Sequence, residues 1–296
     1  MTQSIALVTM FLKLVDTVYK QQSKTAILDA MTEAPSFLNA NEVKVMKLST
    51  VGLGNYSRTT GYPAGDITAA WETMQLSIER GRAFTLDRMD NEESLGLILG
   101  KLITEWMRVH VAPELDAVRF AKYAADAGNV VGSPTTLSAA ADVLAAIDAG
   151  NLALSEDEVP EEGRKLYITH TLNELLKGAM TRTWGNDQSL NRAVKFLEST
   201  EIIAVPQTRF YTEVTLNAGS SSDAGGFTKT SSTGKDINFM IIHPPAVCQP
   251  IKLNQVKYFN PDVNQLSDGH LWQYRLYHDA FVYDNKVNGI YLHKKA

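Results

Sequence analysis

Residues Met74-Gln-Leu-Ser-Ile-Glu-Arg-Gly-Arg-Ala-Phe-Thr-Leu86 largely alternate between apolar and polar side chains and lead within four residues into a long helical pattern. Their apolar residues share one parity, namely Met74, Leu76, Ile78, Phe84 and Leu86. A repeat of two residues is typical of a strand with one buried face. The sequence therefore predicts a strand from about residue 67 to 86, which at ~3.3 Å per residue would reach roughly 60 Å.

Upstream of this strand, a second segment predicts its partner. Val43 to Leu48 is strand-like, and residues 51–65 form a glycine-rich turn region. Together they predict a long two-stranded hairpin with an elaborate tip. An isolated two-stranded ribbon is only marginally stable in water, so the hairpin implies a partner surface.

Downstream, residues 90–127 predict one long helix. Asp90 is the expected N-cap with Glu93 at the third position, and Gly128-Asn129 supplies the stop. Such a helix would be ~55 Å long. Pro113 lies inside the pattern and predicts a kink or offset near Val109.

The remaining segments predict a mixture of helices and strands, which places the chain in the α+β class. Helices are expected at 136–149, ended by Gly150, and at 172–181 and 190–197. Strands are expected at 165–169, 236–243, 272–278, 280–283 and 287–293, with an acidic turn at 155–162 and an exposed polar loop at 217–234. Near the N-terminus, Phe11, Leu14, Val15 and Val18 follow the spacing of an amphipathic helix.

Composition limits the classes of function. The 296 residues are 44% hydrophobic and 21% charged, enough to bury a substantial core. The net charge of −5 disfavours tight recognition of nucleic acid, which normally requires a basic surface. Cys248 is the single cysteine and excludes an intramolecular disulfide; its apolar neighbours predict a buried, unreactive thiol.

The N-terminal apolar run is too short for a membrane span. Ile5 to Leu12 is followed by Lys13 and Asp16, far short of the ~20 apolar residues that a bilayer requires. No positive charge precedes the run and no cleavage site of small residues follows it. We expect a protein that is cytosolic when made and has no membrane partner.

The sequence lacks familiar catalytic motifs, which predicts that the chain is not an enzyme. Residues 226–235 lack the spacing of a phosphate-binding loop, Gly52-Leu-Gly54 lacks the third glycine of a dinucleotide site, and no Gly-x-Ser-x-Gly elbow occurs. The histidines and the one cysteine show no zinc-ligand spacing. We expect no catalytic, cofactor-binding or metal-binding residues and no cofactor.

The remaining titratable and aromatic residues favour structural roles. His243 ends a strand beside Pro244, and His278 with Asp279 would point to opposite faces of a strand, which argues against a catalytic pair. The acidic residues of the 155–162 turn are expected to be solvated rather than to bind calcium, and are Glu156, Asp157, Glu158, Glu161 and Glu162. Core or interface packing rather than base stacking is expected for Trp272, Tyr274, Tyr277, Phe281 and Tyr283.

The order of these elements resembles the major capsid proteins of tailed bacteriophages, which share the Hong Kong-type capsid fold. The resemblance covers nearly the whole chain. It rests on the succession Val51-Gly-Leu-Gly-Asn-Tyr-Ser-Arg58 with Trp71-Glu-Thr73, Glu79-Arg-Gly-Arg-Ala-Phe84 with Met89-Asp-Asn-Glu-Glu93, Val111-Ala-Pro-Glu-Leu-Asp116 with Arg119-Phe-Ala-Lys-Tyr123, Gly234-Lys-Asp-Ile-Asn-Phe239 with His243-Pro244, and Tyr277-His-Asp-Ala-Phe-Val-Tyr283 with Gly289-Ile-Tyr-Leu-His293.

The resemblance implies a division of the chain and a function. Residues 1–42 would be the N-terminal arm, 43–88 the E-loop hairpin, 89–131 with 265–296 the peripheral domain that holds the spine helix, and 132–264 the axial domain. The chain would assemble with itself into hexamers and pentamers. These would form the icosahedral head of the virion, together with a portal. The head would be built in the bacterial cytoplasm and would package double-stranded DNA, which the chain would contact non-specifically.

Two departures from some relatives carry further expectations. No long scaffolding segment precedes the arm, which implies a separate scaffolding protein. Some relatives crosslink subunits through a lysine and an asparagine; Lys47 and Asn55 are ordinary surface candidates, and we expect no crosslink.

Two alternatives remain open. An encapsulin-like nanocompartment shell shares the fold and would enclose a cargo enzyme. A cytosolic hydrolase that uses His243 or His278 is the more remote alternative, and it predicts a deep pocket in a monomer or small oligomer.

Overall fold

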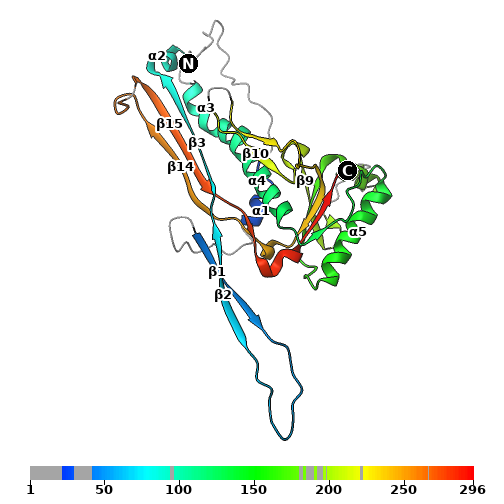
Figure 1. Ribbon diagram of the computed structural model, residues 1–296. Coiled ribbons are helices and arrows are strands. Elements are labelled where there is room, and N and C mark those ends of the chain that lie inside the picture. The colour runs from blue at the N-terminus through cyan, green and yellow to red at the C-terminus, as the bar shows by residue number, and fades with distance from the viewer. Residues whose placement is uncertain are drawn as a thin grey trace.

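The structure is a computed structural model and describes residues 22–29, 42–93, 97–179, 183–184, 190–191, 196–197, 199–220, 223–265 and 267–296. A two-stranded ribbon projects from one side of the body, and a long three-stranded sheet runs beside the spine helices (Figure 1). A six-stranded sheet with its own helices forms the other end. The amphipathic pattern predicted at residues 11–18 lies outside the described residues.

The ribbon consists of β1 (Glu42–Thr50) and β2 (Ile67–Gln75), paired antiparallel from Glu42↔Gln75 to Thr50↔Ile67. This confirms the predicted hairpin. At its tip, Ser57 and Gly61 exchange backbone hydrogen bonds of 3.1 and 2.8 Å. Gly61 has a φ of +80°, a conformation that side chains with a Cβ rarely adopt, so the tight turn depends on glycine there.

The single strand predicted over 67–86 is wrong in one respect, because the chain changes partner halfway. β2 ends at Gln75, and β3 (Ile78–Asp87) instead pairs with β15 (Gly269–His278), which pairs in turn with β14 (Ile251–Phe259). Leu76, Ile78 and Leu86 are nevertheless buried as the alternation predicts. A period of two shows which side chains face inward but not which strand lies alongside.

The spine is divided into α2 (Arg88–Glu93), α3 (Leu97–Trp106), a π-helical turn η1 (Met107–Val111) and α4 (Ala112–Ala125). Asp90 is not the N-cap as predicted. The helix begins at Arg88, because the Asp87 carboxylate accepts the Met89 N–H at 2.9 Å. The irregularity expected near Val109 is confirmed: the widened turn ends at Val111, two residues before Pro113, which lacks an N–H for the helical ladder.

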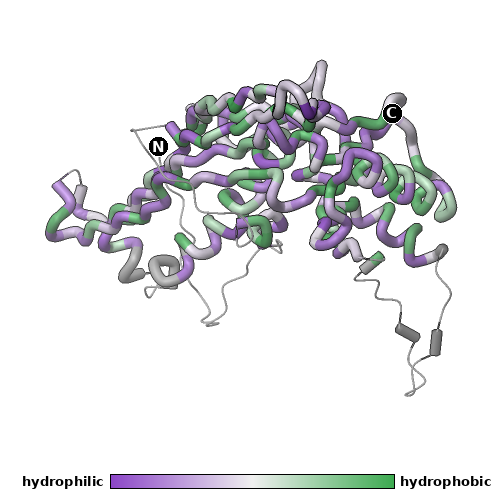
Figure 2. The backbone as a smooth tube through the Cα atoms, turned by 90° about the horizontal axis from the view of Figure 1, so that it is seen from below, coloured by the Kyte–Doolittle hydropathy of each residue, from purple (hydrophilic) through white to green (hydrophobic). Residues whose placement is uncertain are grey.

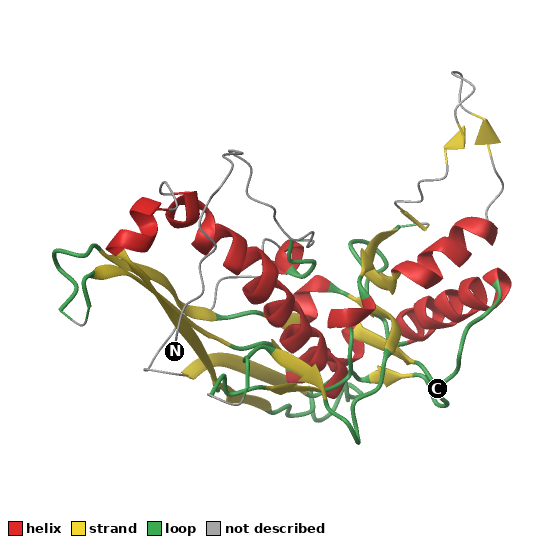
Figure 3. Cartoon of the chain, turned by 90° about the horizontal axis from the view of Figure 1, so that it is seen from above, coloured by secondary structure: helices red, strands yellow, loops and turns green. Residues whose placement is uncertain are grey.

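The spine helices lie along one side of the three-stranded sheet (Figure 3). Trp106 packs edge-on against Phe84 of β3 and Tyr274 of β15, with ring centroids 5.3 Å apart in both pairs. In the tube of Figure 2, hydrophilic and hydrophobic residues are interspersed along these long strands. This is expected of a sheet that is covered on one face only.

The six-stranded sheet has the order β4-β17-β12-β5-β9-β8. Its members are β4 (Asn129–Val130), β17 (Ile290–Lys294), β12 (Ile237–Ile242), β5 (Lys165–Thr169), β9 (Thr200–Val205) and β8 (Phe196–Leu197). Neighbours are antiparallel except β5 with β9 and β17 with β4, which are parallel. Every residue of β12 and β5 is buried, which confirms both predicted strands.

Helices cover both faces of this sheet. Met240 and Ile242 of β12 pack in one cluster with Phe120 and Tyr123 of α4. The opposite face packs against α5 (Ala140–Glu156) and α6 (His170–Ala179), which confirms the helix predicted at 172–181. Within the described residues, no helix is long and apolar enough to cross a membrane.

The prediction that Gly150 ends the preceding helix is wrong. α5 continues through Gly150 to Glu156, because this glycine serves a close contact rather than a cap. A Cβ at position 150 would lie 2.8 Å from the ring of Tyr291 on β17. The helix therefore lies close on the sheet at this point.

The helix predicted at 190–197 is also wrong. Its ends belong to short strands, β7 (Leu190–Asn191), which pairs with β6 (Thr183–Trp184), and β8, which pairs with β9. Pairing with a neighbouring strand overrides the local helical pattern here. The loop expected at 217–234 is interrupted by β11 (Phe227–Lys229), which forms a hairpin with β10 (Val214–Leu216).

The strands of the C-terminal residues 267–296 belong to three different sheets. β15 lies in the three-stranded sheet, β16 (Phe281–Val282) pairs with β13 (Val247–Cys248), and β17 lies in the six-stranded sheet. Residues 284–289 form a 3-10 helix, η4 (Asp284–Gly289), so the last strand starts later than the predicted 287. The short elements α1 (Ala26–Asp29), η2 (Gln207–Arg209) and η3 (Pro244–Ala246) complete the described chain.

Candidate functional site

The ribbon carries an apolar face that the described chain leaves uncovered. The register places Met46 opposite Trp71, Leu48 opposite Ala69, and Thr50 opposite Ile67, and alternate pairs share a face. Trp71 is 62% exposed, Met46 and Leu48 are each 57% exposed, and Ile67 is 74% exposed. Between them lie Lys47↔Ala70 and Ser49↔Thr68, which form the opposite, more polar face.

The tip continues this exposure. Leu53 is fully exposed, and Val51, Tyr56 and Tyr62 are at least 60% exposed. Tyr56 and Tyr62 contact each other with ring centroids 4.9 Å apart, so they form a small aromatic cluster. Monomeric proteins seldom expose contiguous apolar surface of this kind, which usually marks an interaction site.

A buried polar cluster holds residues 22–29 against the spine. Asp116 of α4 accepts hydrogen bonds from the Ser23 hydroxyl at 2.6 Å, the Lys24 N–H at 2.8 Å and the Thr25 hydroxyl at 2.8 Å. Arg209 completes the cluster with an ion pair of 2.9 Å to Asp116. Both side chains are buried, and a buried charge is tolerated when it is paired and hydrogen-bonded.

One helical turn further on, Arg119 makes a second contact to the same segment. Its side chain is fully buried and pairs with Asp29 at 3.0 Å. Burial raises the pKa of Asp29 in spite of the neighbouring guanidinium. Asp116 and Arg119 therefore hold residues 23–29 against α4.

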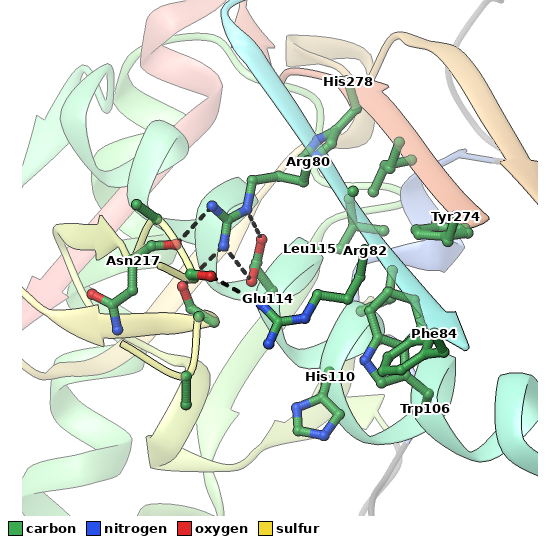
Figure 4. Close-up of a pocket in the computed structure, with 18 residues that line it drawn as sticks. Arg80, Arg82, Phe84, Trp106, His110, Glu114, Leu115, Asn217, Tyr274 and His278 are labelled. Atoms are coloured by element: carbon green, nitrogen blue, oxygen red, sulfur yellow. Dashed lines mark hydrogen bonds and ion pairs between the residues drawn. The ribbon is translucent and has the colours of Figure 1, made fainter. Parts of the chain in front are cut away.

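A cavity of about 250 Å³ lies between β3, β15, the π-helical turn and the hairpin β10–β11. Figure 4 shows Arg80 of β3 extending toward Glu114 of α4 and toward the hairpin. The guanidinium donates to Glu114 Oε1 at 2.6 Å and Oε2 at 3.2 Å. It also donates to the carbonyls of Asn217 at 2.8 Å and Gly226 at 3.1 Å.

This geometry makes Arg80 a junction between three elements of the fold. Both carboxylate oxygens of Glu114 are occupied by the guanidinium, so the pair presents a neutralised bidentate contact rather than a free acid or base. Phe84 and Trp106 form the apolar wall beside it, and His110 lies at the rim in Figure 4. The polar contacts in the cavity therefore connect β3, α4 and the β10–β11 hairpin, which favours a structural role for it.

The residues weighed as catalytic candidates lie in separate surroundings. His278 is 1% exposed and lines the cavity; burial, with Arg119, Arg80 and Lys122 nearby, lowers its pKa to about 4. Asp279 is equally buried but contacts Ser77, on the ribbon side. Burial also lowers the pKa of His243, at the end of β12.

Cys248 is buried, as predicted, and burial raises the pKa of its thiol. The acidic side chains of the 155–162 segment are exposed, which agrees with the expected solvated turn, and Asp157 accepts a hydrogen bond of 2.7 Å from Asn129. Tyr274 belongs to the core, and Tyr277, Phe281 and Tyr283 pack against the base of the ribbon.

The buried polar cluster and the Arg80 junction were not predicted from the sequence. A signal for the first exists: Asp116 and Arg119 are charged residues on the face of the helix that also carries Phe120 and Tyr123. For the second, Arg80 and Arg82 occupy the apolar parity of the strand. Charges at inward positions predict buried partners, although not which ones.

Comparisons with known proteins give a likeness of fold. No protein-family model matches the chain, and no curated protein does. A chain from the asymmetric unit of the bacteriophage PhiM1 mature capsid superposes with a TM-score of 0.66 at 11% identity, covering 98% of this chain and 92% of that one. A chain from Mycobacterium phage Che8 gives 0.65 at 14% identity, with 97% and 96% covered. A chain from the capsid structure of the cyanophage P-SCSP1u gives 0.64 at 12% identity, with 98% and 93% covered.

The likeness extends over almost the full length of both partners in each comparison, so the chain has the fold of these phage structures. The expected α+β class with a Hong Kong-type capsid fold is thereby confirmed.

Proposed function

We propose that this chain is the major capsid protein of a tailed bacteriophage, which assembles into hexamers and pentamers of an icosahedral head that packages double-stranded DNA. The observation that carries the proposal is the uncovered apolar face of the ribbon, on a chain with the fold of phage capsid structures. Such a face gains stability only against another surface. In a shell of identical subunits, that surface belongs to the next copy.

The ribbon supplies a contact of the kind that closes a ring. A head-to-tail contact forms when a surface on one subunit binds a different surface on the next subunit. Repeated contacts of this kind close into a ring when the rotation between neighbouring subunits divides a full turn evenly. Trp71 and Leu48, which are exposed on the ribbon, would contact a different surface on the neighbouring copy. Exposed strand edges of the ribbon would be covered in the same step.

The proposal divides the chain as the resemblance implies, with one change. Residues 1–42 form the N-terminal arm, 43–88 the E-loop, 89–131 with most of 265–296 the peripheral domain, and 132–264 the axial domain. The last strand, β17, pairs with β12, so residues 290–296 are grouped with the axial domain here.

The proposed role is structural and non-enzymatic, located in the virion and assembled in the cytoplasm of the bacterial host. A separate scaffolding protein and a portal are the proposed partners, and contact with packaged DNA is non-specific, in keeping with a net charge of −5. No crosslink is proposed: Lys47 pairs with Asp284 at 3.1 Å, whereas Asn55 lies in the exposed tip.

The alternatives receive less support. An encapsulin-like shell is not favoured, because the structural matches reported above are phage structures. A hydrolase that uses His243 or His278 is disfavoured, because His278 is buried and Glu114, the carboxylate of the neighbouring cavity, is already bound by Arg80.

Electron microscopy of the purified chain, expressed alone and with the products of the adjacent genes, tests the proposal. Closed shells, rings or curved sheets are the expected result. A discrete monomer or dimer under every assembly condition would contradict it.

A further inference from the structure

The ribbon is joined to the body at a break in the strand. Leu76 and Ser77 lie between β2 and β3, at the point where the chain exchanges one strand partner for another. Asp279 Oδ2 accepts the backbone N–H of Ser77 at 2.9 Å and its hydroxyl at 2.8 Å. Both hydrogen-bond donors of Ser77 are therefore bound by one carboxylate, from the segment that follows β15.

The other oxygen of this carboxylate connects it to the body. Asp279 Oδ1 accepts the N–H of Ala280 at 2.9 Å and forms an ion pair of 3.2 Å with Lys122 of α4. Asp279 is 1% exposed, so its charge needs a partner and a full set of donors. The spine helix, the C-terminal segment and the ribbon thus meet at one buried group.

The contacts around this point are few. Leu76 packs in a small cluster with Val43 and Met74, and the Tyr277 hydroxyl donates to the Leu76 carbonyl at 3.0 Å. Val45 extends this apolar cluster along the ribbon. The described polar contacts between the ribbon and the body are exposed: Lys47 pairs with Asp284, and Glu72 accepts the Asp284 N–H at 3.3 Å. Exposed ion pairs contribute little stability.

We propose that Asp279 is the positioning residue that fixes the direction in which the ribbon leaves the body, and that Ser77 is the point about which the ribbon turns when this carboxylate is lost. The lever is long. The far end of β2, at Ile67, lies about 33 Å from Ser77 at ~3.3 Å per residue, so a rotation of ~8° moves it by about 5 Å. That displacement equals the spacing between paired strands, ~4.8 Å.

The consequence for assembly rests on the proposed function, whereas the positioning itself does not. A ribbon that is displaced by one strand spacing would no longer present Trp71 and Leu48 to the same surface of a neighbouring copy. Under the proposed function, loss of Asp279 gives irregular or incomplete shells from folded subunits.

Distance measurement between two spin labels tests the positioning directly. One label is attached at Ser49→Cys on the ribbon and one at Asp148→Cys on α5, both exposed sites, while the native Cys248 is buried and unlabelled in the folded chain. The labelled chain is diluted with unlabelled chain so that only distances within one subunit are read. Asp279→Asn, Ser77→Ala and the matched control Asp284→Asn are then compared.

Asparagine offers one acceptor oxygen in place of two, so Asp279→Asn leaves donors without an acceptor on one side of the group. The expected result is a distance distribution that broadens and shifts in Asp279→Asn, broadens less in Ser77→Ala, and stays unchanged in Asp284→Asn. Amide exchange at Ser77 is expected to rise about tenfold in Asp279→Asn, since hydrogen bonds to charged groups contribute about 1.5 kcal/mol or more.

A distribution in Asp279→Asn as narrow as in the parent chain would overturn the proposal, as would equal broadening in Asp284→Asn. Ser77→Ala keeps the carboxylate and its cation, so it remains decisive if Asp279→Asn does not fold. Because the distance is read within one subunit, a parent chain that never assembles would contradict the proposed function and leave this measurement valid.

Discussion

The six-stranded sheet and the ribbon solve the same physical problem in different ways. The sheet buries both faces within its own chain: β12 and β5 are wholly buried between α4 on one side and α5 with α6 on the other. The ribbon has a comparable set of apolar side chains on one face, and the described chain leaves them in solvent. The first region therefore supplies the core of the fold, whereas the second is the surface that we propose contacts another copy.

This contrast predicts a large loss of stability from a truncation in the sheet. Phe239 is fully buried, stacks on His293 at 4.8 Å and packs against α5. Phe239→Ala should lower the free energy of unfolding by about 3–5 kcal/mol, from lost burial and the cavity that remains. Urea denaturation of the unassembled chain measures it, and a loss below about 1 kcal/mol would show that this face is not the core.

The next largest loss of stability is expected at the buried polar cluster that holds residues 22–29 against the spine. Asp116→Ala leaves the Arg209 guanidinium buried without its carboxylate, which typically costs about 3–5 kcal/mol in buried pairs. We expect a similar fall in the free energy of unfolding, together with faster proteolysis before residue 29. The double variant Asp116→Leu with Arg209→Met removes both charges and should recover part of the loss; no recovery would show that the pair is not coupled.

Acid should weaken the joint beside the cavity. The pKa of His278 is lowered from 6.5 to about 4 by burial, so the folded state disfavours its protonation. The contribution of neutral His278 to the free energy of unfolding is complete above pH 6.5. It is lost as the pH falls toward 4, by up to about 3 kcal/mol. In His278→Asn, denaturation midpoints should fall less between pH 6.5 and 4. If the denaturation midpoints of His278→Asn fall as much at low pH as those of the parent chain, groups other than His278 cause the loss of stability.

The smallest effect on folding is expected at the ribbon. Trp71→Ser and Leu48→Ser replace side chains that contact solvent, so the free energy of unfolding should change by about 0.5 kcal/mol or less. Thermal denaturation beside the matched variants Ser49→Ala and Thr68→Ser, on the polar face, checks it. A loss as large as that of Phe239→Ala would mean that this face is buried within the subunit.

The sequence predicted the elements whose pattern and local packing agree. The alternation of residues 74–86 was sufficient to predict inward and outward faces, and strand 237–242, apolar except for Asn238, was sufficient to predict a buried strand. Pro113 was sufficient to predict the irregularity in the spine. It did not predict the change of partner at Leu76 and Ser77, because both strands keep the same parity across the break. Parity carries no information about neighbours.

Other errors arose where a residue serves a distant contact. Gly150 has the composition of a helix end, but its role is set by Tyr291, which lies far away in the sequence. The short strands at 190–197 are fixed by pairing with their neighbours, which local propensity does not contain. The same limit applies to Asp279, whose partners Ser77 and Lys122 come from different parts of the chain.

The most direct test of the central claim is microscopy of assembly for the two faces of the ribbon. Three chains are imaged at equal concentration: the parent chain, the apolar-face double variant Leu48→Ser with Trp71→Ser, and the polar-face control Ser49→Ala with Thr68→Ser. Their thermal unfolding curves are measured first, to show that all three are equally stable. We expect closed shells or rings from the parent chain and the control, and only dispersed, folded subunits from the apolar-face variant. Shells that form as readily from the apolar-face variant as from the parent chain would contradict the central claim.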